Sequence, residues 1–177
     1  LSVNNLEYET TYYYRAYATN NVGTAYGNIK TFETVETQLN GHDYVDLGLP
    51  SGTLWSTCNV GADSPEGYGD YFAWGETSSK SNYNWNTYSW CNGSNSTLTK
   101  YCNDASYGYN GYTDSLTVIQ TTDDAATANW GTNWRMPTLA ELNELISNCV
   151  VRWTTQNGVS GGLFTGTNGN TIFIPAA

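Results

Sequence analysis

The feature that most limits how this chain can fold is residues 61–121, a stretch with few aliphatic residues and no repeating apolar pattern. Gly, Asn, Ser, Thr and Tyr dominate it, which is typical of loops. A loop this long inside a compact domain is usually functional or disordered, and the many rings argue against disorder because each can bury a large area. The stretch therefore predicts an ordered surface that is built from loops.

Aromatic side chains in this stretch are the candidate ligand contacts. Exposed rings stack on the C–H faces of sugars or anchor protein partners, and Tyr among Ser, Gly and Asn is typical of binding loops. The alternative is that rings wedge the loops against the domain, a role we favour for Trp55, Trp74, Trp130 and Trp134. The residues that we expect to contact a ligand are Trp85, Trp90, Tyr107, Tyr109 and Tyr112.

Residues 1–34 predict a β-hairpin. Tyr12 and Tyr14 alternate with Tyr13 along the first strand, residues 20–23 supply a turn, and residues 25–34 return as the second strand. A lone hairpin is marginal in water, so these strands need partners. The pattern resembles the last two strands of a fibronectin type III-like β-sandwich, which implies a tyrosine corner at Tyr12. The resemblance is carried by Leu6, Thr10, Tyr12, Tyr14, Arg15, Ala16, Ala18, Asn20 and Gly23.

After a linker at residues 35–39, residues 40–177 predict a second unit of the α+β class. It opens as strand, turn at residues 50–52, and strand. One helix is expected to begin with a Thr cap, carry Asp123 and Asp124 in its first turn and end near Gly131. A second helix opens with a capping box of Thr138 and Glu141. Asn-Gly and Gly-Gly turns should divide the strands that follow. The second helix has one apolar face, predicted to be buried, formed by Leu139, Leu142, Leu145, Ile146 and Cys149.

Five short motifs stand in order along this second unit: DLGLPSG, CNVGA, GDYFAWGE, NWRMPT and IFIPAA. Together they resemble the Fibrobacter succinogenes major paralogous domain, which is found in secreted and surface proteins of Bacteroidetes. The resemblance implies a C-type lectin-like fold with small twisted antiparallel sheets, two helices and long loops that hold a binding surface. It places Trp130, Trp134 and Arg135 where the loop enters the second helix. Family members continue past the position of Ala177, so we expect C-terminal truncation or completion by a partner.

The four cysteines are even in number and fit no zinc-binding spacing. Of the three pairings, we favour Cys91 with Cys102 and Cys58 with Cys149, which would contribute about 3 and 4.5 kcal/mol by the loop-entropy model. The alternative is four free, buried thiols. Paired cysteines and a low lysine content predict an exported, extracellular or cell-surface protein.

Acidic and amide side chains also gather after residue 103. Hard cations prefer several oxygen ligands, so a structural calcium ion is one interpretation, although no EF-hand pattern is present. The alternative is that these carboxylates are solvated or cap helices. The candidate ligands are Asp104, Asn110, Asp114, Asp123 and Asp124.

Catalysis has little support in the sequence. His42 is the only histidine and is expected in a turn. Asp70 and Glu76 would lie roughly 20 Å apart on an extended strand, too far for glycosidase chemistry. The sequence Asp-Ser-Leu at residues 114–116 fits a bacterial O-glycosylation signal, so Ser115 is the candidate glycosylation site.

The charge balance limits the partners. A net charge of −10 with six Lys and Arg residues disfavours nucleic acid, and no apolar run is long enough to insert into a membrane. The sequence predicts a non-catalytic binding or adhesion module that recognises a protein or glycan through aromatic loops. The alternative is a structural subunit of an extracellular filament or surface layer, with strands completed by neighbouring copies of itself.

Overall fold

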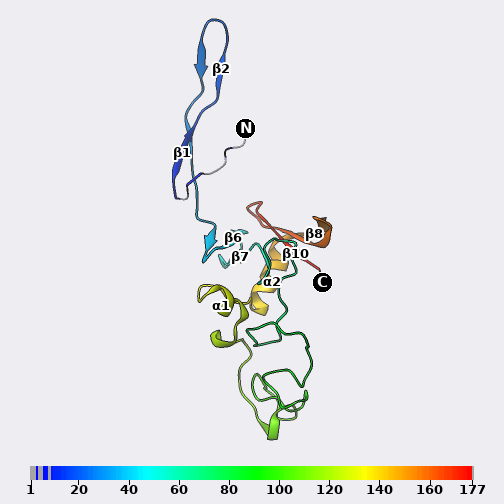
Figure 1. Cartoon of the computed structure of the whole chain (residues 1–177). Helices are drawn as coiled ribbons and strands as arrows, with labels where there is room; N and C mark the ends of the chain where they lie inside the picture. The colour runs from blue at the N-terminus through cyan, green and yellow to red at the C-terminus, as the bar shows by residue number, and fades with distance from the viewer. Residues whose placement is uncertain (1–2, 4–5, 8, 177) are drawn as a thin grey trace. The chain divides into compact units, whose positions relative to one another are not determined.

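The structure is a computed structural model that describes residues 3, 6–7 and 9–176. The chain divides into two compact units, Leu1–Gln38 and Leu39–Ala177, and the division falls within the predicted linker. The extreme ends of the two predicted domains, residues 1–2 and 177, lie outside the described residues, as do residues 4–5 and 8. The described part of the chain contains small two- and three-stranded sheets and two α-helices, which is an α+β composition. Figure 1 shows how these elements follow one another along the chain.

The first unit is the predicted hairpin, interrupted once in each arm. Its base pairs β1 (Thr11–Tyr14) with β4 (Lys30–Glu33), and its tip pairs β2 (Tyr17–Thr19) with β3 (Thr24–Tyr26). The Asn20 side chain closes the tip by accepting hydrogen bonds from the backbone N–H groups of Val22 and Gly23 at 2.9 and 3.1 Å.

At the base of the hairpin, the Tyr12 ring stacks on Phe32 with centroids 5.7 Å apart. The Tyr12 hydroxyl accepts a hydrogen bond from the Glu7 backbone N–H at 2.8 Å, which is the upstream backbone contact expected of a tyrosine corner. Most side chains of the four strands are exposed, so the hairpin has little core of its own.

The second unit contains two three-stranded sheets. One has the order β5 (Gln38–Leu39), β6 (His42–Asp46), β7 (Leu54–Ser56), and the predicted turn between β6 and β7 closes through Gly52 N–H donating to the Leu49 carbonyl at 2.9 Å. The other has the order β10 (Thr171–Pro175), β9 (Val159–Thr165), β8 (Val150–Gln156).

Of the two kinds of turn predicted among the last strands, the Asn-Gly turn is present and the Gly-Gly turn is not. Asn157 and Gly158 form the β8–β9 turn with φ of 48° and 87°, as a tight hairpin requires. Gly161 and Gly162, in contrast, lie inside β9 and make no turn. A Cβ at Gly161 would lie 2.4 Å from the Ile174 carbonyl oxygen, so this glycine permits close packing of β9 on β10.

The two helices follow one another in the chain. The predicted Thr cap of the first is wrong: Thr121–Asp123 form a 3₁₀ turn, η2, and Asp124 caps α1 (Ala125–Trp130) by accepting from Thr127 N–H at 2.9 Å. Asp is at least as good an N-cap residue as Thr. The backbone at Asp124 is extended, so the helix begins after Asp124 and not after a Thr. The second helix, α2 (Leu139–Asn148), has the predicted capping box of Thr138 and Glu141.

The predicted burial of one face of α2 is correct only in part. Leu145 is 1% exposed and Cys149 packs against the same core, but Leu139 is 74% exposed, and Leu142 and Ile146 are also exposed. The helix contacts its own unit along a narrower line than its apolar pattern covers. The pattern identifies an apolar side of the helix but not the width of the surface that meets it.

Two small clusters form the core of the second unit. The first contains Leu47, Leu49, Leu145 and Ile172, from the loop after β6, from α2 and from β10. The second contains Ala126, Trp130 and Trp134 around α1. His42 lies in β6, not in the expected turn, and stacks on Trp130 with centroids 4.2 Å apart.

Candidate functional site

Side-chain hydrogen bonds hold residues 70–102 in place where an aliphatic core is missing. The Asn84 carboxamide oxygen accepts hydrogen bonds from the N–H groups of Asn86 and Thr87 at 2.9 and 3.2 Å, and this turn carries Trp85. Further along, Leu98 makes isolated backbone bridges to Cys91 and Gly108. The strand expected over residues 70–76 is absent, because this segment forms turns and irregular backbone.

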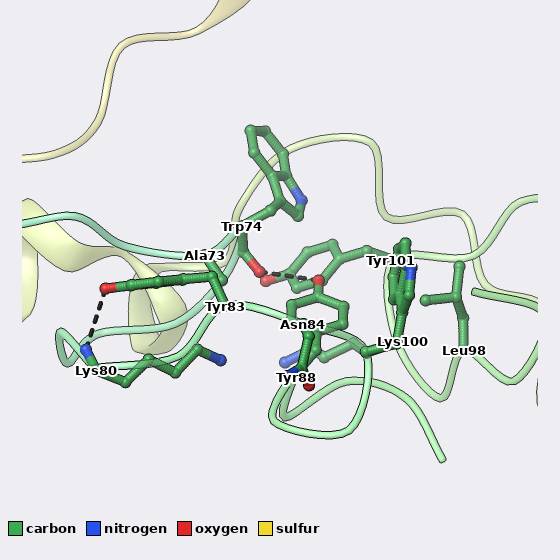
Figure 2. A pocket seen from close by; sticks show the side chains of 10 residues that line it. Ala73, Trp74, Lys80, Tyr83, Asn84, Tyr88, Leu98, Lys100 and Tyr101 are labelled. Atoms are coloured by element: carbon green, nitrogen blue, oxygen red, sulfur yellow. Dashed lines mark hydrogen bonds between the residues drawn. The ribbon is translucent and has the colours of Figure 1, made fainter. Parts of the chain in front are cut away.

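These loops enclose a cleft of about 500 Å³, called here the aromatic cleft (Figure 2). Trp74 is 55% exposed and Trp85 is 48% exposed, so both indoles are accessible to a ligand. The volume suits a small ligand, since most ligand pockets measure about 300–1,000 Å³. The cleft is lined by Ala73, Trp74, Lys80, Tyr83, Asn84, Trp85, Tyr88, Leu98, Lys100 and Tyr101.

The hydroxyl groups of two tyrosines in the cleft donate hydrogen bonds to backbone carbonyls of the same chain. The Tyr88 hydroxyl donates to the Trp74 carbonyl at 2.9 Å, and Figure 2 shows this bond together with the one from the Lys80 N–H to the Tyr83 hydroxyl at 3.0 Å. The Tyr83 hydroxyl in turn donates to the carbonyl of Tyr71.

Burial, followed by the nearby Glu76 carboxylate, raises the pKa of Tyr88 to about 12. Tyr88 therefore stays a protonated donor at neutral pH. The hydroxyls fix the rings and leave their faces toward the cleft.

Both lysines of the cleft are ion-paired. Lys80 Nζ lies 2.6 Å from Glu76 Oε2 and donates to the Thr87 carbonyl at 2.7 Å. The other oxygen of Glu76 accepts the Ser89 N–H at 2.7 Å. Burial raises the pKa of Glu76, but these hydrogen bonds outweigh burial and leave its pKa below the ordinary value.

On the other side of the cleft, Lys100 Nζ lies 2.5 Å from Asp123 Oδ2, and the Tyr101 hydroxyl donates to the same oxygen at 2.6 Å. Lys100 Nζ also lies 4.5 Å from the centre of the Trp90 ring, within range for a cation–π contact. In Figure 2 the two lysine side chains reach toward the middle of the cleft from opposite sides.

The five predicted ligand contacts separate into three groups. Trp85 lines the cleft. Trp90 does not line the cleft, and its indole N–H donates to the Gly75 carbonyl at 2.6 Å. The other three lie on the segment that follows the cleft residues and are exposed but do not line it: Tyr107, Tyr109 and Tyr112.

Four rings of the cleft were missed as ligand contacts. The signal was present, because all four belong to the same aromatic-rich stretch. The sequence predicts a packing role for Trp74, which lies outside the most polar part of the stretch, and the three tyrosines are not among the predicted contacts. The missed residues are Trp74, Tyr83, Tyr88 and Tyr101.

The predicted calcium ligands do not converge. Asp114 accepts the N–H groups of Tyr101, Cys102 and Leu116, and Asp104 accepts the N–H and hydroxyl of Ser106. Asp123 pairs with Lys100, as described above.

The remaining two candidates are also engaged in local structure. Asp124 caps α1 and accepts the Met136 N–H at 2.8 Å, and Asn110 sits in the 3₁₀ turn η1 (Tyr109–Gly111) with a φ of 53°. Within the described ranges, no three His, Cys, Asp or Glu side chains gather as a metal site. Each carboxylate instead accepts hydrogen bonds from backbone or side-chain donors, and only Asp124 has the helix-capping role that the alternative interpretation proposed.

The two predicted disulfides are not present, since Cys58, Cys91, Cys102 and Cys149 are all free thiols. Cys91 Sγ donates to the Trp85 carbonyl at 2.9 Å, and Cys102 Sγ donates to the Asp104 carbonyl at 3.1 Å. Cys149 packs against the core, and burial raises the pKa of its thiol. An even number of cysteines says nothing about which sulfur atoms the fold brings together.

Other candidate residues have separate positions. Glu76 pairs with Lys80. Ser115, the candidate glycosylation site, is exposed, and its modification stays a prediction. In the part of the chain that the structure describes, no helix is long and apolar enough to cross a membrane. Searches against family models, curated proteins and solved structures gave no match to this chain.

Proposed function

We propose that this chain is a non-catalytic binding module of an exported protein, and that it binds a glycan in the aromatic cleft. The observation that carries the proposal is the cleft itself, with five rings around about 500 Å³. Aromatic faces suit sugars because a pyranose presents flat C–H surfaces. A protein ligand that inserts one side chain is the other class of partner, and the test below separates the two.

The non-catalytic part of the proposal rests on the carboxylates near the cleft. Glu76 is held by Lys80 and Ser89, and Asp123 is held by Lys100 and Tyr101. A glycosidase needs one carboxyl group with a raised pKa as the acid and a second as base or nucleophile. The pKa of each of these two groups is lowered instead, which disfavours the acid role.

The proposed fold of the second unit is a C-type lectin-like domain of the major paralogous type, preceded by the end of a fibronectin type III-like sandwich. Small antiparallel sheets, two helices and a long loop region support the former. The hairpin with its Tyr12 contact supports the latter. The low lysine content and the motifs that resemble surface proteins support an extracellular or cell-surface location.

A glycan array tests the proposed function directly. We expect the full chain to bind a subset of glycans, and Trp85→Ala to weaken binding to the best of them by about tenfold or more, because buried aromatic contacts dominate binding energy. The control is Trp153→Ala, since Trp153 is 68% exposed on β8 and does not line the cleft. Equal binding by the two variants, or binding only to proteins, would reject the cleft as a glycan site.

A second candidate function is a subunit of an extracellular filament or surface layer. The observation in its favour is β8, which among the described strands pairs with β9 alone and exposes Val150, Val151 and Trp153. An outer strand of this kind can accept a strand from a neighbouring copy. Regular polymers in electron micrographs, lost in Val150→Lys, would favour this function, whereas a monomer at all concentrations would reject it.

A further inference from the structure

We propose that the aromatic cleft selects an uncharged saccharide and discriminates against both anionic and cationic ones. This inference rests on the proposed glycan-binding function and deepens it by naming the class of ligand. It follows from the way in which the lysines, the carboxylates and the ring polar groups of the cleft are already used.

The two lysines of the cleft lie near the ring faces that a cationic ligand would need. An aromatic cage binds an ammonium group through the faces of its rings. Here Lys80 Nζ lies 5.5 Å from the centre of the Tyr83 ring and 5.9 Å from that of Tyr88. Lys100 Nζ lies 5.3 Å from the centre of the Tyr101 ring. Two resident ammonium groups therefore already occupy positions near the ring faces that would attract a cation, which leaves less of those faces open to another one.

An anionic ligand gains little from the same lysines. Each ammonium already has a carboxylate within 2.6 Å, Glu76 for Lys80 and Asp123 for Lys100. The side chains of both carboxylates are more than nine-tenths buried, so neither can turn into solvent and leave the lysine to a ligand. With a net charge of −10, the chain as a whole also repels an anion.

The remaining polar groups are suited to neutral hydroxyls. The hydroxyls of Tyr83, Tyr88 and Tyr101 all bind the chain itself. The indoles of Trp74 and Trp85 are about half exposed, and an indole N–H can only donate a hydrogen bond. The cleft therefore offers ring faces and neutral donors, which match the C–H faces and hydroxyl oxygens of an uncharged sugar.

The test uses matched ligands that differ only in charge. The best neutral oligosaccharide from the array is compared by calorimetry with its derivatives oxidised to a uronate or converted to an amine at the sugar C6 position. We expect the full chain to bind the neutral sugar at least about tenfold more tightly than either derivative. A charged group that leaves water without gaining a partner costs about 1–3 kcal/mol or more. Affinity for the neutral sugar should change less than twofold between low and high salt.

One variant tests the cause. Asp123→Asn removes the carboxylate from Lys100, so affinity for the uronate should rise relative to the neutral sugar by about tenfold. If that variant does not fold, Glu76→Gln makes the same change at Lys80. Tighter binding of the uronate or the amine by the unmodified chain would overturn the inference and leave glycan binding standing. Binding of no saccharide at all would remove the proposed function, and the inference with it.

Discussion

The ion pair between Glu76 and Lys80 gives a prediction about how the cleft is held together. In Glu76→Gln the charge is lost, and the single amide oxygen can accept from only one of the two donors, the Lys80 ammonium and the Ser89 N–H, so the NH₂ group faces the other as donor against donor. The Glu76 side chain is 7% exposed and that of Lys80 is 21% exposed, so the pair lies between a surface pair and a fully buried one. Surface pairs contribute about 0.2–1 kcal/mol and breaking a buried pair costs about 3–5 kcal/mol, so we expect a loss of about 1–3 kcal/mol.

Urea unfolding followed by tryptophan fluorescence measures this loss in the relevant unit, because all seven tryptophans lie between residues 55 and 153. With a urea slope of about 1.5–2 kcal/mol per molar, the midpoint should fall by about 0.5–2 M. The matched control is Asp63→Asn, which removes an exposed carboxylate of the same unit and should change the free energy of unfolding by less than about 0.5 kcal/mol.

The pH dependence of the same pair has a defined sign. The folded pKa of Glu76 lies below its ordinary value of 4.5, so the unfolded state binds the proton more tightly. The stabilisation is therefore complete well above pH 4.5 and is lost as the pH falls through the folded pKa. The difference between the unmodified chain and Glu76→Gln should be largest near pH 7 and shrink toward pH 3. A difference that is absent at pH 7, or that grows in acid, would refute the argument that the charge pair stabilises the cleft.

Three further predictions concern the scaffold. Gly75→Ala should abolish most glycan binding, because the φ of Gly75 is +71° and the new Cβ would lie 2.7 Å from a ring carbon of Tyr101. Calorimetry measures the loss of binding. The control is Gly111→Ala, because Gly111 has a φ of +79° but open space around it. Leu145→Ala should lower the free energy of unfolding by about 2–5 kcal/mol in urea, whereas the exposed Leu139→Ala should cost much less. Alkylation in denaturant without reductant should add four groups per chain by mass spectrometry, and a chain that takes none would show that both disulfides form after all.

Local signals in the sequence predicted local structure well. The capping box at Thr138 and Glu141 and the turn at Asn157 and Gly158 each depend on residues a few positions apart, so the sequence contains all the partners. The predicted burial of the apolar face of α2 was wrong in part because it depends on residues that are distant in the sequence. An apolar stripe shows which side of a helix avoids water, but its partners come from distant strands and loops, whose extent no spacing within the helix reveals.

The residues that line the cleft could be predicted from the sequence only in part. The aromatic-rich stretch is predicted from the sequence to form an ordered surface, and of the five predicted ligand contacts the structure places Trp85 in the lining of the cleft. The choice among its rings depends on contacts such as Tyr88 to the Trp74 carbonyl and Trp90 to the Gly75 carbonyl, which join residues 14 and 15 positions apart in irregular backbone. No helical or strand period sets these distances, so composition identified the surface but not the rings that line it.

The use of rings in place of aliphatic side chains in this loop region has a physical reason. A Leu could fill space between loops, but it has no polar group with which to satisfy a loop carbonyl, and an unsatisfied buried carbonyl is costly. Tyr88 and Trp90 do both: their polar ends bind backbone carbonyls that no strand or helix satisfies, while their rings exclude water. A loop held in this way has ring faces left over on its outer side, as at Trp74 and Trp85. The same hydrogen bonds that order the loops therefore also create the surface proposed to bind a sugar. Tyr88→Phe, which removes a hydroxyl but no ring from the cleft, should weaken sugar binding for this reason.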